Sequence, residues 1–172
     1  MTRKRSFCLD SDVFIAAKNA YYAFAICPGF WKSLVYHHGK DRVFSIDQVR
    51  REILAGRESE DLVGWAKNEL PNEFFKPTNS SDVLGAFGEV MLWAQRSTQY
   101  TEPAKAKFAT EADGWLVAYA RINNAIVVTN EQPRPDSKSR ILLPDVCSHF
   151  KVAYYNTFAM LKDLEVCFEW NE

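Results

Sequence analysis

The sequence predicts an α/β fold built on a mainly parallel central sheet. Segments of strand character alternate with segments of helix character, the order expected when helices connect parallel strands. With 172 residues, of which 47% are hydrophobic, the chain is long enough to fill one core. No internal repeat or low-complexity linker interrupts it. We therefore expect a single domain over residues 1–172.

Five short apolar runs are the expected strands. They are rich in Val, Ile, Phe and Tyr, and turn-forming or polar residues bound them. Polar side chains that directly follow parallel strands meet at one edge of a sheet, where such folds bind their ligands. The expected strands are residues 6–9, 42–46, a short piece near 74–75, 125–129 and 152–155.

Helices are expected where a capping residue precedes an apolar periodicity. Asp12 is expected to cap the first helix, Asp47 the helix that carries Glu52, and Asn156 the closing helix. Gly56 is expected to end the helix that carries Glu52. Further helical segments are expected at 30–34, at 62–70, from Ser80 or Ser81 onward, and after a first turn that holds Pro103.

The charge balance excludes proteins that bind nucleic acid or membranes through a high overall positive charge. Lys plus Arg number 21 and Asp plus Glu number 22, so the net charge is −1 and any basic binding surface must be local. No apolar run approaches the roughly 20 residues of a transmembrane helix, and the apolar stretch near the start is too short for a signal peptide. We expect a cytoplasmic protein without membrane contact.

The cysteines and histidines do not predict a site of their own. The cysteines lack Cys-x-x-Cys spacing and stand among apolar residues, so we expect small core residues rather than zinc ligands or disulfides. No histidine is paired in sequence with a Ser or Cys nucleophile motif, and His37 and His38 are expected in a polar loop. The other residues considered are Cys8, Cys27, Cys147, Cys167 and His149.

Four acidic residues at the edges of apolar segments predict one metal-binding pocket. Asp10 closes the first expected strand, and Glu131 follows the strand at 125–129. Glu52 lies beside the apolar stripe of its helix, and Asp113 precedes another apolar segment. Two unit charges about 4 Å apart repel by roughly 4 kcal/mol at an effective dielectric near 20. A divalent cation removes that repulsion, and an all-oxygen ligand set suits Mg²⁺ or Mn²⁺.

Each acid also has a purely structural interpretation. Asp113 stands three residues after Thr110, the spacing of a helix capping box. Asp10 fits a turn at a strand end, Glu52 a solvated helix position and Glu131 a loop. The convergence of all four on strand ends or adjoining helical turns favours the metal site.

Several segments resemble known motifs. Residues 9–15, Glu52, residues 112–118 and residues 127–131 look like successive motifs of PIN-domain ribonucleases, in matching order and spacing across nearly the whole chain. Residues 17–22, 28–31, 43–47 and 144–147 resemble a bacterial PIN-like branch similar to VapC-type toxins. The resemblance implies a three-layer α/β/α fold, metal-dependent RNA cleavage and often a cognate antitoxin. Related folds commonly form homodimers.

Carried over to this sequence, the resemblance implies that Asp10, Glu52, Asp113 and Glu131 hold one or two Mg²⁺ or Mn²⁺ ions, which activate water to attack an RNA phosphate. Two positions depart from the pattern: Asp12 stands where Asn or Ser is frequent, and Glu131 replaces the commoner Asp. Asp145 either supports the site or caps the turn before Val146. The supporting residues would be Ser11, Asp12, Thr129, Asn130 and Asp145.

An RNA substrate needs positive charge beside the acidic pocket, because phosphate contacts supply much of nucleic-acid affinity. The loop at 132–140 carries Arg134, Lys138 and Arg140, and Lys18 lies about two helical turns past Asp10. Aromatic residues near Lys18 could stack on unpaired bases or lie in the core. These are Tyr21, Tyr22 and Trp31.

Three alternatives remain at this stage. A receiver-like signalling domain also clusters acids at strand ends, although Glu52 and the pair Asn130 and Glu131 fit it poorly. A non-catalytic PIN-like scaffold that binds proteins would lack metal-dependent cleavage. A structure-specific DNA nuclease would share the same acidic chemistry.

Overall fold

A computed structural model describes residues 4–57 and 60–170, and within these ranges the strands form one parallel sheet of five. The strand order is β3-β2-β1-β4-β5, with Cys8 in β1 paired to Phe44 in β2 and to Val127 in β4. The predicted α/β class is confirmed. The strands are β1 (Phe7–Leu9), β2 (Val43–Ile46), β3 (Phe75–Lys76), β4 (Ile126–Val128) and β5 (Tyr154–Tyr155).

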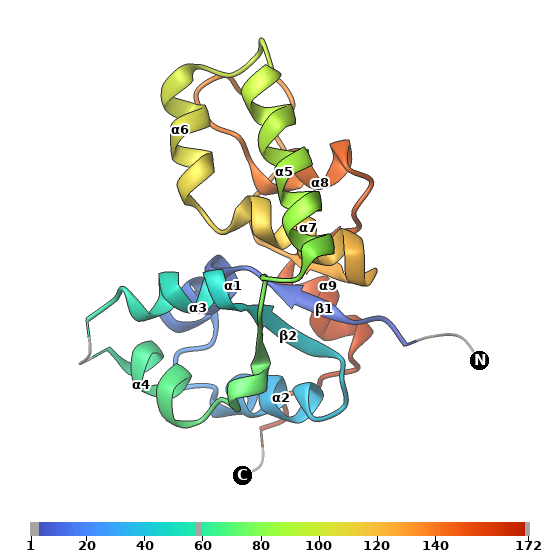
Figure 1. The fold of residues 1–172 in the computed structure, drawn as a ribbon. Helices are drawn as coiled ribbons and strands as arrows, with labels where there is room; N and C mark the ends of the chain where they lie inside the picture. Colours follow the sequence, from blue (N-terminus) through green and yellow to red (C-terminus); the bar gives the residue numbers. More distant parts are fainter. Residues whose placement is uncertain (1–3, 58–59, 171–172) are drawn as a thin grey trace.

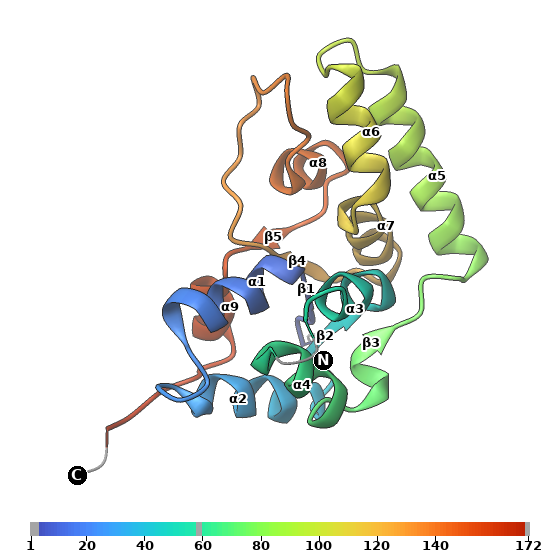
Figure 2. The same ribbon diagram turned by 90° about the vertical axis from the view of Figure 1, so that its left-hand side faces the viewer.

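Helices cover both faces of the sheet and make three α/β/α layers. In Figure 1, α5 to α8 lie above the sheet and α2 and α4 lie below it; Figure 2 shows α9 on the same side as α2. A π-helical segment, η1 (Ala17–Tyr21), directly follows α1, and a 3₁₀ turn, η2 (Asn72–Phe74), precedes β3. The helices are α1 (Ser11–Ala16), α2 (Pro28–His38), α3 (Asp47–Leu54), α4 (Asp61–Asn68), α5 (Ser81–Arg96), α6 (Glu102–Thr110), α7 (Asp113–Asn123), α8 (Leu143–His149) and α9 (Thr157–Asp163).

The order of the strands places the carboxyl ends of β1 and β4 side by side. The chain leaves β1 toward β2 and β3, then returns to the other side of β1 to form β4 and β5. This reversal creates a switch point at the carboxyl edge, the position where open α/β sheets bind ligands. Figure 2 views the molecule from this edge, where α1 and α3 begin.

Two predicted helix caps are confirmed and two are wrong. Ser80 caps α5 by accepting a hydrogen bond from the Val83 amide, and Asn156 caps α9 in the same way. The residue that caps α1 is Asp10 rather than Asp12, because β1 runs into this helix without a loop. Asp47 lies in the first turn of α3 and accepts hydrogen bonds from Thr78 instead of capping the helix.

The core confirms part of the cysteine prediction. Cys8 and Cys147 are buried, whereas Cys27 is half-buried and Cys167 is exposed in the segment after α9. His37 and His38 form the last turn of α2 rather than a polar loop. None of the described helices is long and apolar enough to cross a membrane.

Candidate active site

Asp10 and Asp113 form the buried floor of an acidic site at the carboxyl edge, and we call them the floor acids. Asp10 directly follows β1 and is 5% exposed; its Oδ1 accepts a hydrogen bond of 2.7 Å from the Ser11 amide. Its own amide donates to the carbonyl of Val128 in β4 over 2.9 Å. Asp113 is 9% exposed and begins α7. Main-chain pairing of neighbouring strands therefore sets where Asp10 lies.

Asp113 is held in place by close packing between helices. A Cβ atom on the next residue, Gly114, would lie 2.6 Å from Cε of Met91 in α5 and 3.1 Å from Phe87, so a larger residue would force these side chains to shift. The capping-box interpretation of Asp113 is wrong, because the Thr110 hydroxyl donates to the Lys107 carbonyl within its own helix, and the residue before α7 makes no side-chain cap. No helix cap therefore accounts for this acid.

Burial raises the pKa of both floor acids well above the ordinary value for Asp. The neighbouring negative charges raise each pKa further: Asp113, Asp12 and Glu52 act on Asp10, and Glu131, Glu111 and Glu52 act on Asp113. Within residues 4–57 and 60–170, neither floor acid forms an ion pair with a Lys, Arg or His. The predicted acids thus lie within electrostatic range of one another.

Glu52 and Glu131 lie at the rim of the site, and we call them the rim acids. Oε1 of Glu52 accepts a hydrogen bond of 2.9 Å from the amide of Ala112, just before Asp113. Oε2 of Glu131 accepts one of 3.0 Å from the amide of Leu143, and its Oε1 forms an ion pair with Arg140. Both rim carboxylates are thus hydrogen-bonded to partners outside the floor.

Asp12, Thr129 and Asn130 connect the end of β4 to the start of α1. The Thr129 hydroxyl lies 3.1 Å from Oδ2 of Asp10 and 3.2 Å from Oδ2 of Asp12, but its single proton can go to only one of them at a time. The amide of Asn130 also donates to Asp12, over 2.9 Å. The other Asp12 oxygen, Oδ1, is buried and accepts no hydrogen bond from the part of the chain that the structure describes.

The chemistry of these residues fits a hard divalent cation, although the ligands are not assembled around one point. The available donors are carboxylate and hydroxyl oxygens, and the unpaired Asp12 Oδ1 leaves an unsatisfied acceptor beside the floor acids. Among the described residues, no three His, Cys, Asp or Glu side chains are placed to hold a metal ion together. Binding of one ion by all four acids would therefore require these side chains to move closer together.

The sequence profile of one protein family matches residues 7–168, a range that runs from β1 to beyond α9. That family is described as "Domain of unknown function (DUF4411)". The chain belongs to this family. No curated protein is similar enough to the chain to count as a match.

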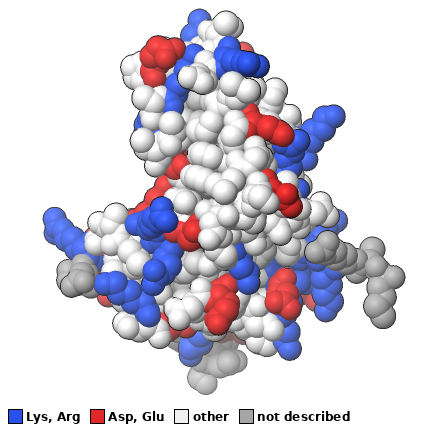
Figure 3. All heavy atoms as spheres, in the orientation of Figure 1, with Lys and Arg blue, Asp and Glu red and all other residues white. Residues whose placement is uncertain are grey.

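The cations predicted to bind RNA in this DUF4411 protein fall into two groups. Lys18 forms an ion pair of 3.0 Å with Glu60, and Arg140 pairs with Glu131, so neither is free to bind phosphate as placed. The side chains of Arg134 and Lys138 are exposed on the loop between β4 and α8. In Figure 3, acidic side chains gather at the waist of the molecule, between α3 and the arm formed by α5 and α6, with basic side chains next to them.

Asp145 serves the loop rather than the acidic site. Its Oδ2 accepts a hydrogen bond of 3.0 Å from the Arg134 amide. Gln99 also holds the main chain of this loop, because its side-chain Nε2 donates hydrogen bonds to the carbonyls of Pro135 and Ser137. The loop that carries Arg134 and Lys138 is therefore anchored at several points.

Sequence reasoning missed two features of the DUF4411 site. Glu111 is half-buried and raises the pKa of Asp113, and its place two residues before Asp113 was the only available signal. The main-chain amides of Ala112 and Leu143 donate hydrogen bonds to the rim acids, and such donors cannot be recognised from the residue type.

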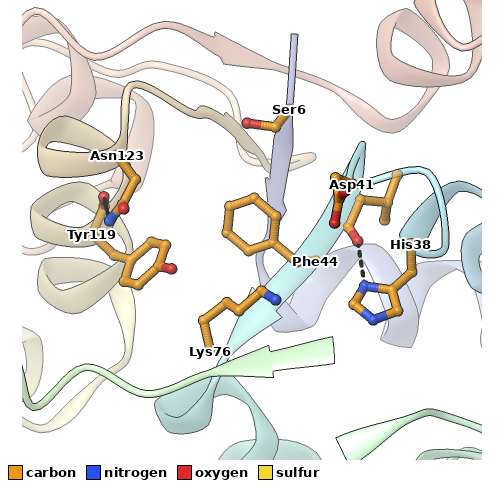
Figure 4. A pocket seen from close by; sticks show the side chains of 8 residues that line it. Ser6, His38, Asp41, Phe44, Lys76, Tyr119 and Asn123 are labelled. Atoms are coloured by element: carbon orange, nitrogen blue, oxygen red, sulfur yellow. Dashed lines mark hydrogen bonds between the residues drawn. The ribbon is translucent and has the colours of Figure 1, made fainter. Parts of the chain in front are cut away.

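A cavity elsewhere in the molecule is separate from the acids. It measures about 170 Å³ and lies beside Phe44, where Lys76, Tyr119 and Asn123 point toward it (Figure 4). His38 also lines it and contacts the Val43 carbonyl through Nδ1 over 3.0 Å. None of the floor or rim acids lines this cavity. We therefore place the candidate active site at the carboxyl edge.

Proposed function

We propose that this DUF4411 protein is a metal-dependent endoribonuclease of the PIN-like type, in which the floor and rim acids hold Mg²⁺ or Mn²⁺. One observation carries the proposal: carboxylates from four separate segments lie within electrostatic range of one another near the switch point of a parallel sheet, and the two most buried form no ion pair among the described residues. Asp10 also caps α1, but Asp113 makes no helix cap, so capping does not explain why both carboxylates are buried at this edge.

In this proposal a bound divalent ion lowers the pKa of water and neutralises charge on the phosphate. Asp10 and Asp113 would provide two preset oxygen donors; Glu52 would add its Oε2, since its Oε1 accepts from the Ala112 amide, and Glu131 would join them in place of its ion pair with Arg140. The Thr129 hydroxyl orients Asp10, and Asp12 holds the Asn130 main chain beside it. Burial of the floor keeps bulk water from competing for these carboxylates.

A protein-binding scaffold is the second candidate function. It is favoured by the hydrogen bonds that occupy both rim acids and by the lack of an assembled ligand set among the described residues. On this alternative the acids would stabilise loops around α7 and α8. The two functions differ in whether any nucleic acid is cleaved.

The test uses purified protein with single-stranded RNA, hairpin RNA and matching DNA substrates. We expect cleavage of unpaired or looped RNA in Mg²⁺ or Mn²⁺ and none in excess chelator, because the proposed hydrolysis depends on water activated by the metal. Undiminished cleavage in chelator would overturn the metal role, cleavage of DNA alone would indicate the DNA nuclease, and no cleavage at all would favour the scaffold.

The role as the toxin of a toxin–antitoxin pair rests on the sequence resemblance alone. A toxin that cleaves RNA should arrest growth when it is expressed without its antitoxin. We therefore expect bacterial cells to stop growing when the parent protein is induced, and to keep growing when the Asp10→Asn variant is induced.

A further inference from the structure

Two aromatic side chains from different elements form an exposed pair on one side of the sheet. Tyr21, at the end of η1, is 56% exposed, and Phe158, in the first turn of α9, is 49% exposed. Their ring centroids lie 5.3 Å apart at an interplanar angle of 84°. The two rings therefore leave aromatic surface that a binding partner can cover.

The π-helical turn sets the outward direction of Tyr21. The amide of Tyr22 donates to the Ala17 carbonyl over 2.7 Å, a five-residue spacing that inserts an extra residue into the turn. Such π-turns occur frequently at functional sites. Tyr22 stacks on Phe30 at 4.5 Å and Trp31 is buried, so of the three aromatics predicted to stack on bases, Tyr21 alone points outward.

The aromatic pair is connected to the acidic site through Asn130. The main chain of Asn130 binds Asp12, while its side-chain oxygen accepts hydrogen bonds from the amide and hydroxyl of Thr157, over 3.1 Å and 2.9 Å. Phe158 is the next residue. Figure 2 shows α1, which leads to Tyr21, and α9 on the same side of the sheet, near β4 and β5. Both rings are therefore held by elements that begin at the acidic edge.

We propose that Tyr21 and Phe158 form a stacking platform for an unpaired base of a substrate strand that also reaches the acidic site. The proposal rests on the nuclease function proposed above and specifies its substrate as single-stranded or looped. Lys162 lies four residues after Phe158, on the same face of α9, and is exposed, so a cation for the adjoining phosphate accompanies the rings. An exposed aromatic surface next to a cation is the arrangement that binds single strands without reading their sequence.

The experiment measures binding of a labelled RNA oligonucleotide in chelator, so that cleavage cannot interfere. The double variant Tyr21→Leu/Phe158→Leu keeps apolar side chains but removes both π-faces, and we expect it to bind about 10-fold more weakly or worse. Tyr21→Phe keeps the ring and should bind like the parent. The matched control is Tyr36→Leu, because Tyr36 is also exposed and packs edge-on against His37, but in the last turn of α2.

Oligonucleotides with a single abasic position make the test specific for stacking. The parent should lose affinity when one particular base is missing, and the double variant should no longer distinguish that oligonucleotide from the intact one. Thermal melts check that each variant is folded. Equal affinity of parent and double variant, or no binding of any oligonucleotide by the parent, would overturn the platform, and a protein partner would then be the better occupant.

The outcome also separates the platform from the nuclease. Binding that depends on Tyr21 and Phe158, without cleavage of any substrate in Mg²⁺ or Mn²⁺, would retain the platform and reject the proposed activity. Metal-dependent cleavage that the double variant performs with unchanged KM and affinity would retain the activity and reject the platform.

Discussion

The floor and the rim of the acidic site differ in how their carboxylates are held. Asp10 and Asp113 are buried, fixed by strand pairing and helix packing, and have raised pKa values. Glu52 and Glu131 are more exposed and hydrogen-bonded to main-chain amides or to Arg140. The fold therefore fixes the carboxylates of the two floor acids in advance, at a cost in charge repulsion. The carboxylates of the two rim acids are held by local hydrogen bonds and an ion pair that a metal ion can replace.

The largest effect is expected from neutralising a floor acid. Asp10→Asn and Asp113→Asn should each lower cleavage by at least about 100-fold, because each removes a direct ligand rather than an outer partner. In metal-free buffer the same variants should be as stable as the parent or more so, since one buried negative charge is gone. Stabilisation by Mn²⁺ should be largely lost. A cleavage assay and thermal melts with and without Mn²⁺ measure these effects.

Asp82→Asn is the matched control, because Asp82 also lies in the first turn of a helix but is exposed on α5. It should retain cleavage and the response to Mn²⁺. An Asp113→Asn protein that is destabilised yet fully active would show that the floor acid has a structural role alone.

A smaller effect is expected at the rim, where the ion pair of Glu131 with Arg140 opposes ligand binding. Glu131→Gln should weaken Mn²⁺ binding by about 10-fold, whereas Arg140→Ala should strengthen it, because the variant frees Glu131 and removes a neighbouring positive charge. Mn²⁺ titrations followed by thermal shift measure both. Weaker Mn²⁺ binding in Arg140→Ala would mean that Arg140 orients Glu131 for the metal rather than competing with it.

The pH dependence of stability should distinguish the buried floor acids from the exposed acids. Because the folded pKa of Asp113 is raised, its contribution to stability is fully present below the ordinary value of 3.8 and is lost as the pH rises through the folded pKa. In chelator, the parent should therefore lose stability relative to Asp113→Asn as the pH rises from about 4 to 8. We expect the Tm of the parent to fall a few degrees relative to that of Asp113→Asn, since about 1 kcal/mol of unfolding free energy shifts Tm by roughly 2–4 °C for a domain of this size. Parallel melting curves across this range would contradict the raised pKa.

The position of the floor could be predicted from the sequence, but the state of the rim could not. Asp10 at the end of an apolar run marked the carboxyl edge directly, because strand ends in a parallel sheet meet there. The hydrogen bonds of Glu52 and Glu131 depend on the turn before α7 and on the path of the loop before α8, and main-chain amides donate the same bond whatever side chain they carry. Arg140 was predicted to meet RNA, yet it reaches back to Glu131 across that loop.

The helix caps likewise show that local connections could not be predicted from the sequence. Asp10 and Asp12 are both good capping residues, and only the direct passage from β1 into α1 decides between them. The exposure of Cys167 likewise depends on the segment after α9, where no apolar periodicity was available to predict it. Periodic segments were predictable, and irregular connections were not.

The smallest effect is expected on the loop beside the rim, which tests whether positive charge there serves the substrate. Arg134→Ala combined with Lys138→Ala should weaken RNA binding modestly and reduce the dependence of affinity on salt by about one power of the salt concentration for each lost phosphate contact. Mn²⁺ binding should not change, because these side chains are exposed and the ion pair of Arg140 with Glu131 stays intact.

The matched control for the loop removes two exposed lysines away from the carboxyl edge, Lys4→Ala with Lys32→Ala. Binding titrations from low to high salt should give this control the slope of the parent. If both double variants lower the slope equally, the loop contributes only general positive charge. If neither does, Arg134 and Lys138 do not contact phosphate, and Arg140, after its release from Glu131, and Lys162 beside the aromatic pair become the next cations to test.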